Sequence, residues 1–433
     1  MNNNDGKRIG PDVHLNLNVR GLSKSATLAI NEMSKSLMRE GRRVYKFGFG
    51  QSPFPVPPSV VSALQANAYQ KDYLPVAGLE PLREAVAGYY RRTQSLSFND
   101  DNILIGPGSK ELMFLLQFCY YGDLVLPTPA WVSYAPQAAI LGRRICYLPT
   151  CAKDRFCLKP EALATMCAGD PKCPRLLVLN YPSNPAGTTY SADELKALAR
   201  VARRYKMLIL SDEIYGEFHY SGPHVSIARF YPEGTIISSG LSKWCGAGGW
   251  RLGTFAFPKA LEWLRNAMTA VASETYTSVS APIQYAAINA FQGGPEIEEY
   301  LAQSRRVLKT LGNHVAGVLT KHGVQVIQPS GAFYLFPDFS SCKRVKREKG
   351  GLSSKDLCNR ILKDTGVALL PGSDFGRSAN ELTARLAYVN FDGTQALAGA
   401  SRVPLNKPLG RDFLETYCSD CLQGIQCLCK WLE

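Results

Sequence analysis

The chain contains 433 residues, of which 45% are hydrophobic, 10% aromatic and 20% charged, and its formal net charge is +13. This composition is that of a globular protein with more than one core, and no apolar run approaches the roughly 20 residues of a membrane span, so we expect no membrane association. The positive charge is spread along the chain, which argues against nucleic-acid binding and suits the attraction of anionic cofactors and substrates.

The N-terminal part begins with a polar stretch, residues 1–18, that lacks the apolar core of a signal peptide. We therefore expect a loosely held tail on a cytoplasmic protein. Residues 19–43 carry a helical pattern that ends at a C-cap signal, Glu40-Gly41. The glycines and prolines of KFGFGQSPFPVPPSV predict a loop, which is followed by a helix over residues 58–69, a turn at Gly78 and another helix.

Short apolar runs then alternate with helical patterns. They predict strands at residues 102–105, 124–126, 145–148, 176–179, 207–210, 235–238 and 252–257. Ser191 is the expected N-cap of the helix SADELKALARVARRY. Near-continuous apolar strands separated by helices indicate an α/β fold whose mostly parallel sheet is covered by helices on both faces.

The pattern changes after about residue 295. A long helix from Pro295 to about His322 is followed by VQVIQPSGAFYLF, which predicts strand, turn and strand. A helix at residues 354–365 and strands at 367–370 and 383–390 follow. We therefore predict a large domain over residues 58–294, a smaller α+β domain over 295–433, and an N-terminal segment, 19–57, that joins the small domain.

Two features near the C-terminus have competing interpretations. The basic run KRVKREK, residues 343–349, lies beside Gly350 and Gly351, and such a run is usually a solvated loop rather than a nucleic-acid site. Cys418, Cys421, Cys427 and Cys429 begin with a zinc-like spacing, but no histidine is near. Their apolar pattern favours a terminal amphipathic helix, so we predict no metal and, from thirteen cysteines without a secretion signal, reduced thiols.

Polar residues follow the first predicted strands at the edge of the sheet where ligands bind in parallel folds. Gly108, Ser109 and Lys110 open a helix, where free N–H groups and the helix dipole favour an anion. Trp131 can stack on a planar ring, although most tryptophans simply pack. Asn184 lies in the proline-rich turn NYPSNPAG and can donate to an oxygen.

The next two strand ends add a carboxylate and an amine. Asp212, in SDEIY, follows a buried strand and needs a partner such as a protonated ring nitrogen, and Tyr215 lies three residues later. Lys243 lies in a loop of small residues, where desolvation lowers the pKa of the amine until it attacks a carbonyl; a surface lysine is the alternative. Arg251 suits an anion. Together these groups match the needs of pyridoxal 5′-phosphate (PLP).

Eight segments strengthen this interpretation: KSATLAINE (24–32), YLPVAGLEPLREAV (73–86), NYPSNPAGTTYS (180–191), SDEIY (211–215), SKWCGAGGWRLG (242–253), PSGAFYLF (329–336), LLPGSDFG (369–376) and ARLAYV (384–389). With these segments in this order over about residues 19–390, the chain resembles the fold-type I, class I/II PLP-dependent aminotransferases, in the style of bacterial aspartate aminotransferases.

The resemblance implies roles around the cofactor ring. Lys243 would form the Schiff base and move a proton between Cα and C4′, and Asp212 would keep the pyridine nitrogen protonated. Asn184 and Tyr215 would donate to the 3′-oxygen. Trp131 would stack on the ring, and it would line the substrate position together with Asn184.

The resemblance also implies roles at the two ends of the site. The phosphate would be held by Gly108, Ser109, Lys110, Ser242 and Arg251, with Tyr73 reaching it from the neighbouring subunit of a homodimer. Arg385 would grip the substrate α-carboxylate as a bidentate fork, and the backbone of Gly50 would lie near it.

Three departures from the family pattern concern the phosphate and the substrate. Gly240 stands where many relatives carry serine, so Ser242, or after it Ser239, becomes the candidate phosphate hydroxyl. The segment WCGAGGW after Lys243 also departs from the pattern that is usual in this family. The stretch SETYTSVSAP (273–282) contains no arginine for a substrate side-chain carboxylate, which argues against strict aspartate or glutamate specificity. Tyr276 could line a pocket there or only pack.

The predicted function is the transfer of an α-amino group from an L-amino acid to a 2-oxo acid by a ping-pong PLP mechanism. A β- or γ-eliminating lyase or synthase of the same fold is the alternative, because the carbanion is common to all of them. A non-enzymatic regulator of this fold is a remote third possibility, since residues 1–18 are too short for a DNA-binding domain.

Overall fold

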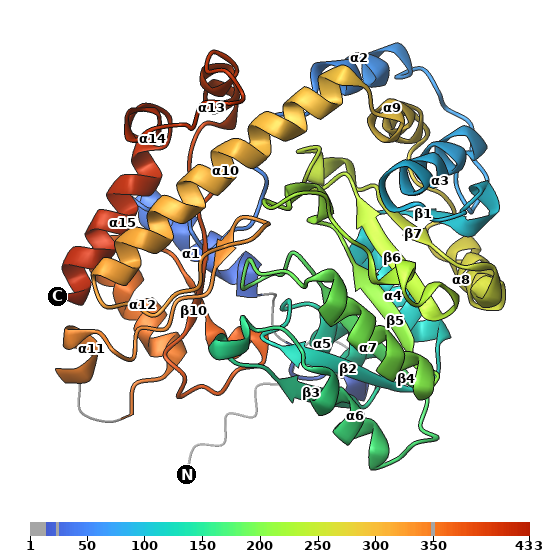
Figure 1. The fold of residues 1–433 in the computed structure, drawn as a ribbon, viewed down its shortest axis with the longest axis horizontal. Coiled ribbons are helices and arrows are strands. Elements are labelled where there is room, and N and C mark those ends of the chain that lie inside the picture. The colour runs from blue at the N-terminus through green and yellow to red at the C-terminus, as the bar shows by residue number, and fades with distance from the viewer. Residues whose placement is uncertain (1–13, 23–25, 348–350) are drawn as a thin grey trace, which may run out of the picture.

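The computed structural model describes residues 14–22, 26–347 and 351–433, and its centre is a seven-stranded sheet in the order β1-β7-β6-β5-β4-β2-β3 (Figure 1). The strands are β1 (Ile103–Gly106), β2 (Asp123–Thr128), β3 (Ile145–Pro149), β4 (Arg175–Asn180), β5 (Leu208–Asp212), β6 (Thr235–Gly240) and β7 (Gly253–Ala256). Neighbouring strands from β3 to β6 pair in parallel, and β7 is antiparallel to both of its neighbours. The predicted α/β fold with a mostly parallel sheet is confirmed.

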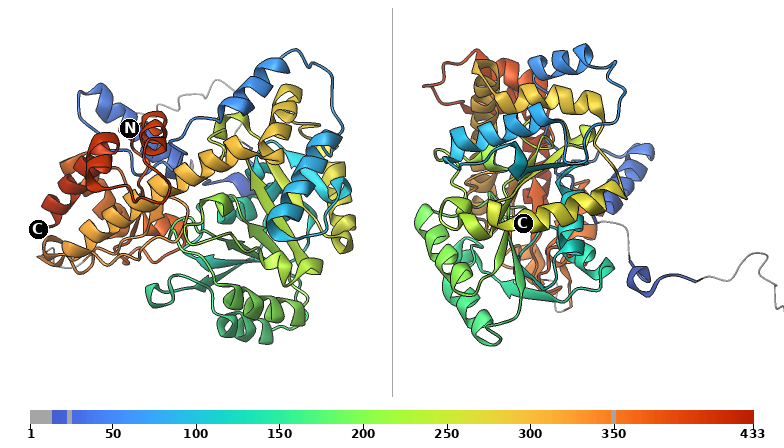
Figure 2. Two further views of the ribbon diagram at one scale, coloured as in Figure 1. Left: turned by 45° about the horizontal axis from the view of Figure 1, so that its top comes forward. Right: turned by 90° about the vertical axis from the view of Figure 1, so that its right-hand side faces the viewer.

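Helices cover both faces of this sheet, as its edge-on view shows (Figure 2). They are α2 (Pro58–Ala66), α3 (Glu80–Gln94), α4 (Ser109–Cys119), α5 (Tyr134–Ile140), α6 (Pro160–Ala168), α7 (Ala192–Arg204), α8 (Glu262–Ser273) and α9 (Ala281–Gln292). In β4, Leu176 and Val178 face the core formed with α4, α5 and α8, whereas Leu177 and Leu179 face α6 and α7. Each fully buried leucine contributes roughly 2 kcal/mol, which explains why the strand is apolar throughout.

The predicted start of α7 is confirmed in atomic detail. The Ser191 hydroxyl accepts a hydrogen bond from the Glu194 backbone N–H at 3.3 Å, and the Glu194 carboxylate accepts one from the Ser191 N–H at 2.8 Å. This reciprocal arrangement satisfies two N–H groups that the helix itself leaves unpaired.

A three-stranded antiparallel sheet, β8-β10-β9, forms the second layer of structure. Its strands are β8 (Tyr334–Leu335), β9 (Leu370–Pro371) and β10 (Ala384–Ala387), and its helices are α10 (Pro295–Lys321), α11 (Lys343–Arg347), α12 (Ser354–Thr365), α13 (Gly393–Ser401), α14 (Arg411–Tyr417) and α15 (Ser419–Leu432). The long α10 begins beside α2, where the Ser59 N–H bonds the Glu296 carboxylate, and runs to α13 and α15 (Figure 1).

The N-terminal segment packs against this second sheet. Helix α1 (Ala26–Arg39) lies near β9, and its Ile30 and Leu37 contact Val44, Leu362 and Ala368. The helix predicted over residues 19–43 is therefore shorter, and Leu17–Val19 forms a separate 3-10 turn.

Three predictions in the C-terminal half need correction. Residues 324–336 contain only the short strand β8, because Gln325 pairs instead as an isolated bridge with Asp338. The basic run is not a loop where it is described: residues 343–347 form α11, whose Val345 is buried, and residues 348–349 lie outside the described residues. The terminal helix is two helices that meet at Cys418.

All thirteen thiols are free, and Cys418, Cys421 and Cys429 are buried. In the described parts of the chain, no group of three or more histidine, cysteine or acidic side chains is placed to hold a metal ion. No helix among those residues is long and apolar enough to cross a membrane.

Candidate active site

A cavity of about 590 Å³ lies where the carboxyl ends of β5 and β6 meet the second sheet. All of the predicted site residues line it except two, Gly108 and Tyr73. Gly108 lies directly beneath Arg251, since a Cβ atom there would be 2.1 Å from Arg251 Nη2. Tyr73 lies outside the cavity with its side chain 92% exposed.

Lys243 projects into this cavity from the loop that follows β6. Its Nζ donates to the Gly50 backbone oxygen at 2.7 Å and lies 5.7 Å from the centre of the Tyr215 ring. Burial, helped by the positive charge of Arg385, lowers the pKa of Lys243 to about 8, although the negative charge of Asp212 opposes this shift. The amine is therefore partly unprotonated, and nucleophilic, near neutral pH.

Asp212, at the end of β5, presents one satisfied and one unsatisfied oxygen. The Tyr134 hydroxyl donates to Oδ2 at 2.5 Å, whereas the buried Oδ1 has no hydrogen-bond partner among the described residues. Burial raises the pKa of Asp212 to about 6, against the lowering effect of the Tyr134 hydrogen bond and of the Ile214 N–H. A buried carboxylate oxygen in this state calls for a donor.

Arg385, on β10, brings a guanidinium into the same cavity from the second sheet. Its Nη1 donates to Asn184 Oδ1 at 3.0 Å and its Nη2 to the Gly48 oxygen at 2.7 Å, while the buried Nε has no partner among the described residues. The Asn184 oxygen is thus engaged by Arg385. The side-chain nitrogen of Asn184 makes no hydrogen bond to a described residue.

Tyr215 and Tyr334 form the wall between Lys243 and Arg385. Their hydroxyl oxygens are 2.7 Å apart, and the Arg385 guanidinium lies 4.8 Å from the centre of the Tyr334 ring. Burial raises the pKa of Tyr215, so its phenol stays protonated and remains a donor. A Cβ atom on Gly50 would be 2.1 Å from the Tyr334 hydroxyl, which explains why a glycine stands at residue 50.

The opposite end of the cavity is cationic. Helix α4 begins there at Ser109, after Gly108 in a left-handed conformation (φ +90°). Arg251 donates to the Gly248 and Pro107 oxygens, at 3.0 and 3.3 Å, which aims its fork toward the start of the helix. Desolvation and then the Arg251 charge lower the pKa of Lys110. Free N–H groups and two cations make this end suited to an anion.

Trp131, Ser242 and Tyr276 have different positions relative to the cavity. Trp131 lines it and packs edge-on against Tyr134, with ring centres 5.2 Å apart, and the Lys110 Nζ lies 5.1 Å from the Trp131 ring. Ser242 also lines it, whereas Ser239 does not. Tyr276 donates to the Ile105 oxygen and contacts the core around α4 and α8, so it packs and does not line the cavity.

Tyr134 and Tyr334 are the residues that sequence reasoning missed. Tyr334 lies within the segment PSGAFYLF, which resembles the family without indicating a role for this tyrosine. Tyr134 lies three residues after Trp131, at the first turn of α5, and this spacing after a strand end was the available signal. Its partner, Asp212, is 78 residues away in sequence, and no local pattern reveals such a pair.

The sequence matches a known protein family and several of its members. The family described as "Aminotransferase class I and II" matches residues 42–392. The aspartate aminotransferase of Geobacillus stearothermophilus is 35% identical over 380 residues, which cover 86% of this chain and 93% of that protein. The asparagine–oxo-acid transaminase of Streptococcus mutans is 31% identical over 386 residues, which cover 86% and 94%.

A solved structure agrees over almost the whole chain. The aspartate aminotransferase from Thermus thermophilus with maleate superimposes with a TM-score of 0.83 at 26% identity, covering 97% of this chain and 100% of that one. The agreement extends to both sheets and confirms the predicted fold-type I architecture. The chain belongs to the class I and II aminotransferases and is an enzyme that transfers amino groups between amino acids and 2-oxo acids.

Proposed function

We propose that the cavity binds PLP, the cofactor of the class I and II aminotransferases. Lys243 would be the amine that bonds to the cofactor and that accepts the proton from the substrate. The observation that carries this proposal is the position of Lys243 Nζ. It lies 2.7 Å from the Gly50 oxygen in a cavity that Asp212 and Arg385 also line. Nucleophile, carboxylate and guanidinium thus converge on one space.

The fit of the cofactor ring rests on Asp212. Its Oδ1 is buried and lacks a donor among the described residues, and a protonated pyridine nitrogen supplies one. When bound, PLP supplies an electron-withdrawing ring that stabilises negative charge at the substrate α-carbon. Asp212 keeps the ring nitrogen protonated, and Tyr134 keeps Asp212 oriented and ionised through the bond to Oδ2.

The fit of the phosphate rests on the start of α4. A Cβ atom on Gly253 would be 2.1 Å from the Ser109 nitrogen, so the strand and the helix approach each other as closely as a backbone allows. The N–H groups of the first turn, Ser242, Lys110 and Arg251 would then hold the phosphate.

Lys243 acts on the substrate as a base. With its pKa near 8, the amine accepts a proton from the substrate α-carbon and returns it later, and the Gly50 oxygen holds Nζ in place between these events. Arg385 would bind the substrate α-carboxylate. Its bonds to Asn184 and Gly48 fix the plane of the guanidinium and leave the Nε donor unused.

We expect dicarboxylic amino acids to be accepted as donors. Four cationic side chains line the cavity, Lys110, Lys243, Arg251 and Arg385, against a single described carboxylate, Asp212. Asp212, the phosphate and one α-carboxylate together balance these four charges, so the expectation of a second carboxylate rests on the relatives. The relatives named as aspartate aminotransferases and as an asparagine–oxo-acid transaminase support the same expectation. The absence of arginine from residues 273–282 still argues against strict aspartate or glutamate specificity.

We also propose a homodimer in which Tyr73 of the partner subunit completes the phosphate site. Within one chain Tyr73 and Tyr69 are exposed to 92% and 74%, and large exposed aromatic side chains favour an interface. Light scattering gives the oligomeric state, and Tyr73→Phe should weaken PLP binding. A monomer with full activity would rule this part out.

The central experiment follows one half of the reaction. Purified enzyme loaded with PLP is mixed with aspartate, glutamate, asparagine, tyrosine or phenylalanine, and the aminated cofactor and the 2-oxo acid are quantified by mass spectrometry. We expect equal amounts of both, with the dicarboxylic donors reacting fastest, and neither with Lys243→Ala. A 2-oxo acid released without amination of the cofactor would instead indicate an eliminating lyase.

A further inference from the structure

A second cavity, of about 660 Å³, shares none of its lining residues with the catalytic one. Its walls are the C-terminal half of α3, residues 216–224, and the middle of α10. Residues 216–224 directly follow Tyr215 in sequence. The cavity therefore lies beside the contact between α10 and the segment that carries part of the catalytic site, and its volume is that of a small-molecule site.

The lining of this cavity is strongly cationic. Of the side chains described there, four are arginine or lysine, and Glu217 is the single carboxylate. The four are Arg92 on α3 and Arg305, Arg306 and Lys309 on α10. Burial lowers the pKa of the neighbouring His219, so that side chain adds no charge near neutral pH.

Structural bonds account for Arg306 but leave donors on the other three cations. Arg306 donates to the backbone oxygens of residues 400, 403, 404 and 407, which fastens the loop after α13. In contrast, Arg92 uses only Nη2, on the oxygens of residues 291 and 292. Arg305 uses only Nη1, on Glu217, and Lys309 makes one bond of 3.2 Å, to the Tyr220 oxygen. Within the described chain the remaining N–H groups have no partner.

Glu217 does not compete for these remaining donors. Its Oε1 accepts from the Tyr89 hydroxyl at 2.6 Å and its Oε2 lies 3.3 Å from Arg305 Nη1. Both carboxylate oxygens are therefore engaged on the wall of the cavity, and the basic side chains that line it outnumber this one carboxylate.

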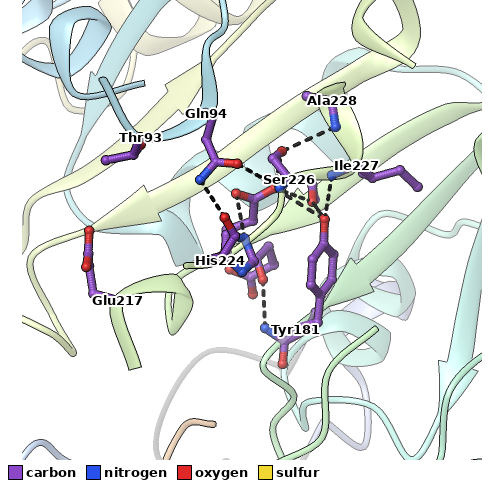
Figure 3. A network of polar contacts seen from close by, with 12 residues as sticks. Thr93, Gln94, Tyr181, Glu217, His224, Ser226, Ile227 and Ala228 are labelled. Carbon is purple, nitrogen blue, oxygen red and sulfur yellow. Dashed lines mark hydrogen bonds and ion pairs between the residues drawn. The ribbon is translucent and has the colours of Figure 1, made fainter. Parts of the chain in front are cut away.

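His224 adds a buried imidazole, paired with Glu213, to the same cavity. Its side chain is only 8% exposed, and its Nε2 lies 3.0 Å from Glu213 Oε2, while Nδ1 has no hydrogen-bond partner among the described residues. Figure 3 shows how this wall is held. The Gln94 amide donates to the His224 backbone oxygen at 3.0 Å and accepts from the Ser226 N–H at 2.8 Å, so α3 fixes the loop in place.

We propose that this cavity is a binding site for a small anion with two or more negative charges, carried on phosphate or carboxylate groups. Arg92 from α3 and Arg305 and Lys309 from α10 hold the anion from two sides. The bound anion links α10, which leads to the second sheet, to the segment after Tyr215. This site goes beyond the transfer reaction and does not depend on the cofactor.

The test is calorimetric titration of the PLP-loaded enzyme at constant ionic strength, with inorganic pyrophosphate and citrate as the two probes. Binding of pyrophosphate alone assigns phosphate chemistry, and binding of citrate alone assigns carboxylate chemistry. The double variant Arg305→Gln, Lys309→Met should bind the accepted probe at least about tenfold more weakly while KM for the amino donor stays unchanged. Binding should persist in Arg385→Lys, because Arg385 belongs to the other cavity.

A second variant avoids the loss of native ion pairs. Thr93 lies at the rim of the cavity, is exposed, and bonds only the Tyr89 oxygen four residues earlier. Thr93→Glu should weaken binding about threefold by charge repulsion. Thr416→Glu is the matched control, since Thr416 is exposed on α14 and makes the same bond to the Asp412 oxygen. The proposal fails if neither probe binds at millimolar concentration, if the cavity variants bind as the wild type does, or if Arg385→Lys abolishes binding.

Discussion

The hydrogen bond between Tyr134 and Asp212 offers a sharp test of how the site works. Tyr134→Phe removes one oxygen and keeps the ring that packs against Trp131. Both partners are buried, and the bond measures 2.5 Å. Because the phenol donates to the ionised carboxylate, it stabilises the charged form of Asp212, the form that pairs with a protonated ring nitrogen.

The expected magnitude follows from the charge of the acceptor. A hydrogen bond to a charged group is worth about 1.5–3 kcal/mol, and about 2 kcal/mol of lost transition-state stabilisation corresponds to about a 30-fold lower kcat/KM. The pH dependence has a defined sign. The Tyr134 bond lowers the pKa of Asp212, which burial raises to about 6, so its removal raises that pKa further. The acid limb of the kcat/KM profile should therefore move to higher pH.

The assay is steady-state transamination between pH 5 and 9, together with a PLP titration followed by fluorescence. Tyr231→Phe is the matched control, because the buried Tyr231 hydroxyl also makes one bond, of 2.9 Å, to the Met207 backbone oxygen far from the site. The control should lose stability and keep both kcat/KM and its pH profile. If Tyr134→Phe kept the wild-type profile and PLP affinity, the role assigned to Tyr134 would be wrong.

Three further predictions concern single residues. Arg385→Lys loses the fork held by Asn184 and Gly48, so KM for amino donors should rise about 100-fold with a smaller change in kcat; an unchanged KM in donor titrations would contradict this. Cofactor-free enzyme should take up PLP faster as the pH rises toward 8 and no faster above it, as stopped-flow absorbance will show, because Lys243 must be unprotonated; a flat profile would contradict its pKa. Gly240→Ser should lower the free energy of unfolding by about 1–3 kcal/mol in denaturant titrations, because the serine Cβ would lie 2.6 Å from the Leu252 oxygen. Gly240→Ala should have the same effect, and full stability of both variants would refute the clash.

The sequence predicted those site residues whose positions follow from strand order. Asp212 and Lys243 come within a few residues after apolar runs, and runs that pair in parallel place their ends at one edge. Arg385 is different. It comes from the second sheet, and only the family resemblance pointed to it, because nothing in its local pattern says which cavity a strand of another sheet will face.

The missed features all depend on contacts between distant segments. Residues 343–347 form a helix because Val345 is buried and the Arg344 guanidinium lies 4.2 Å from the Trp431 ring, 87 residues later. A run of basic residues contains no sign of that partner. The sequence did not reveal the bond from Tyr134 to Asp212, because the two residues are distant in sequence and an aromatic ring at a helix start usually only packs.

Gly240 shows how a departure from the family pattern is explained by its neighbours. Gly240 pairs with Gly253 across β6 and β7, and neither position has space for a side chain: a Cβ would be 2.6 Å from the Leu252 oxygen in the first case and 2.1 Å from the Ser109 nitrogen in the second. The glycine pair therefore lets the start of α4 come close to the strand that leads to Lys243. A serine at residue 240 would push β6 away from the Leu252 oxygen, just before β7, and so disturb the strand that leads to Lys243. A phosphate hydroxyl must then come from the loop beyond the strand, where Ser242 lines the cavity and Ser239 does not.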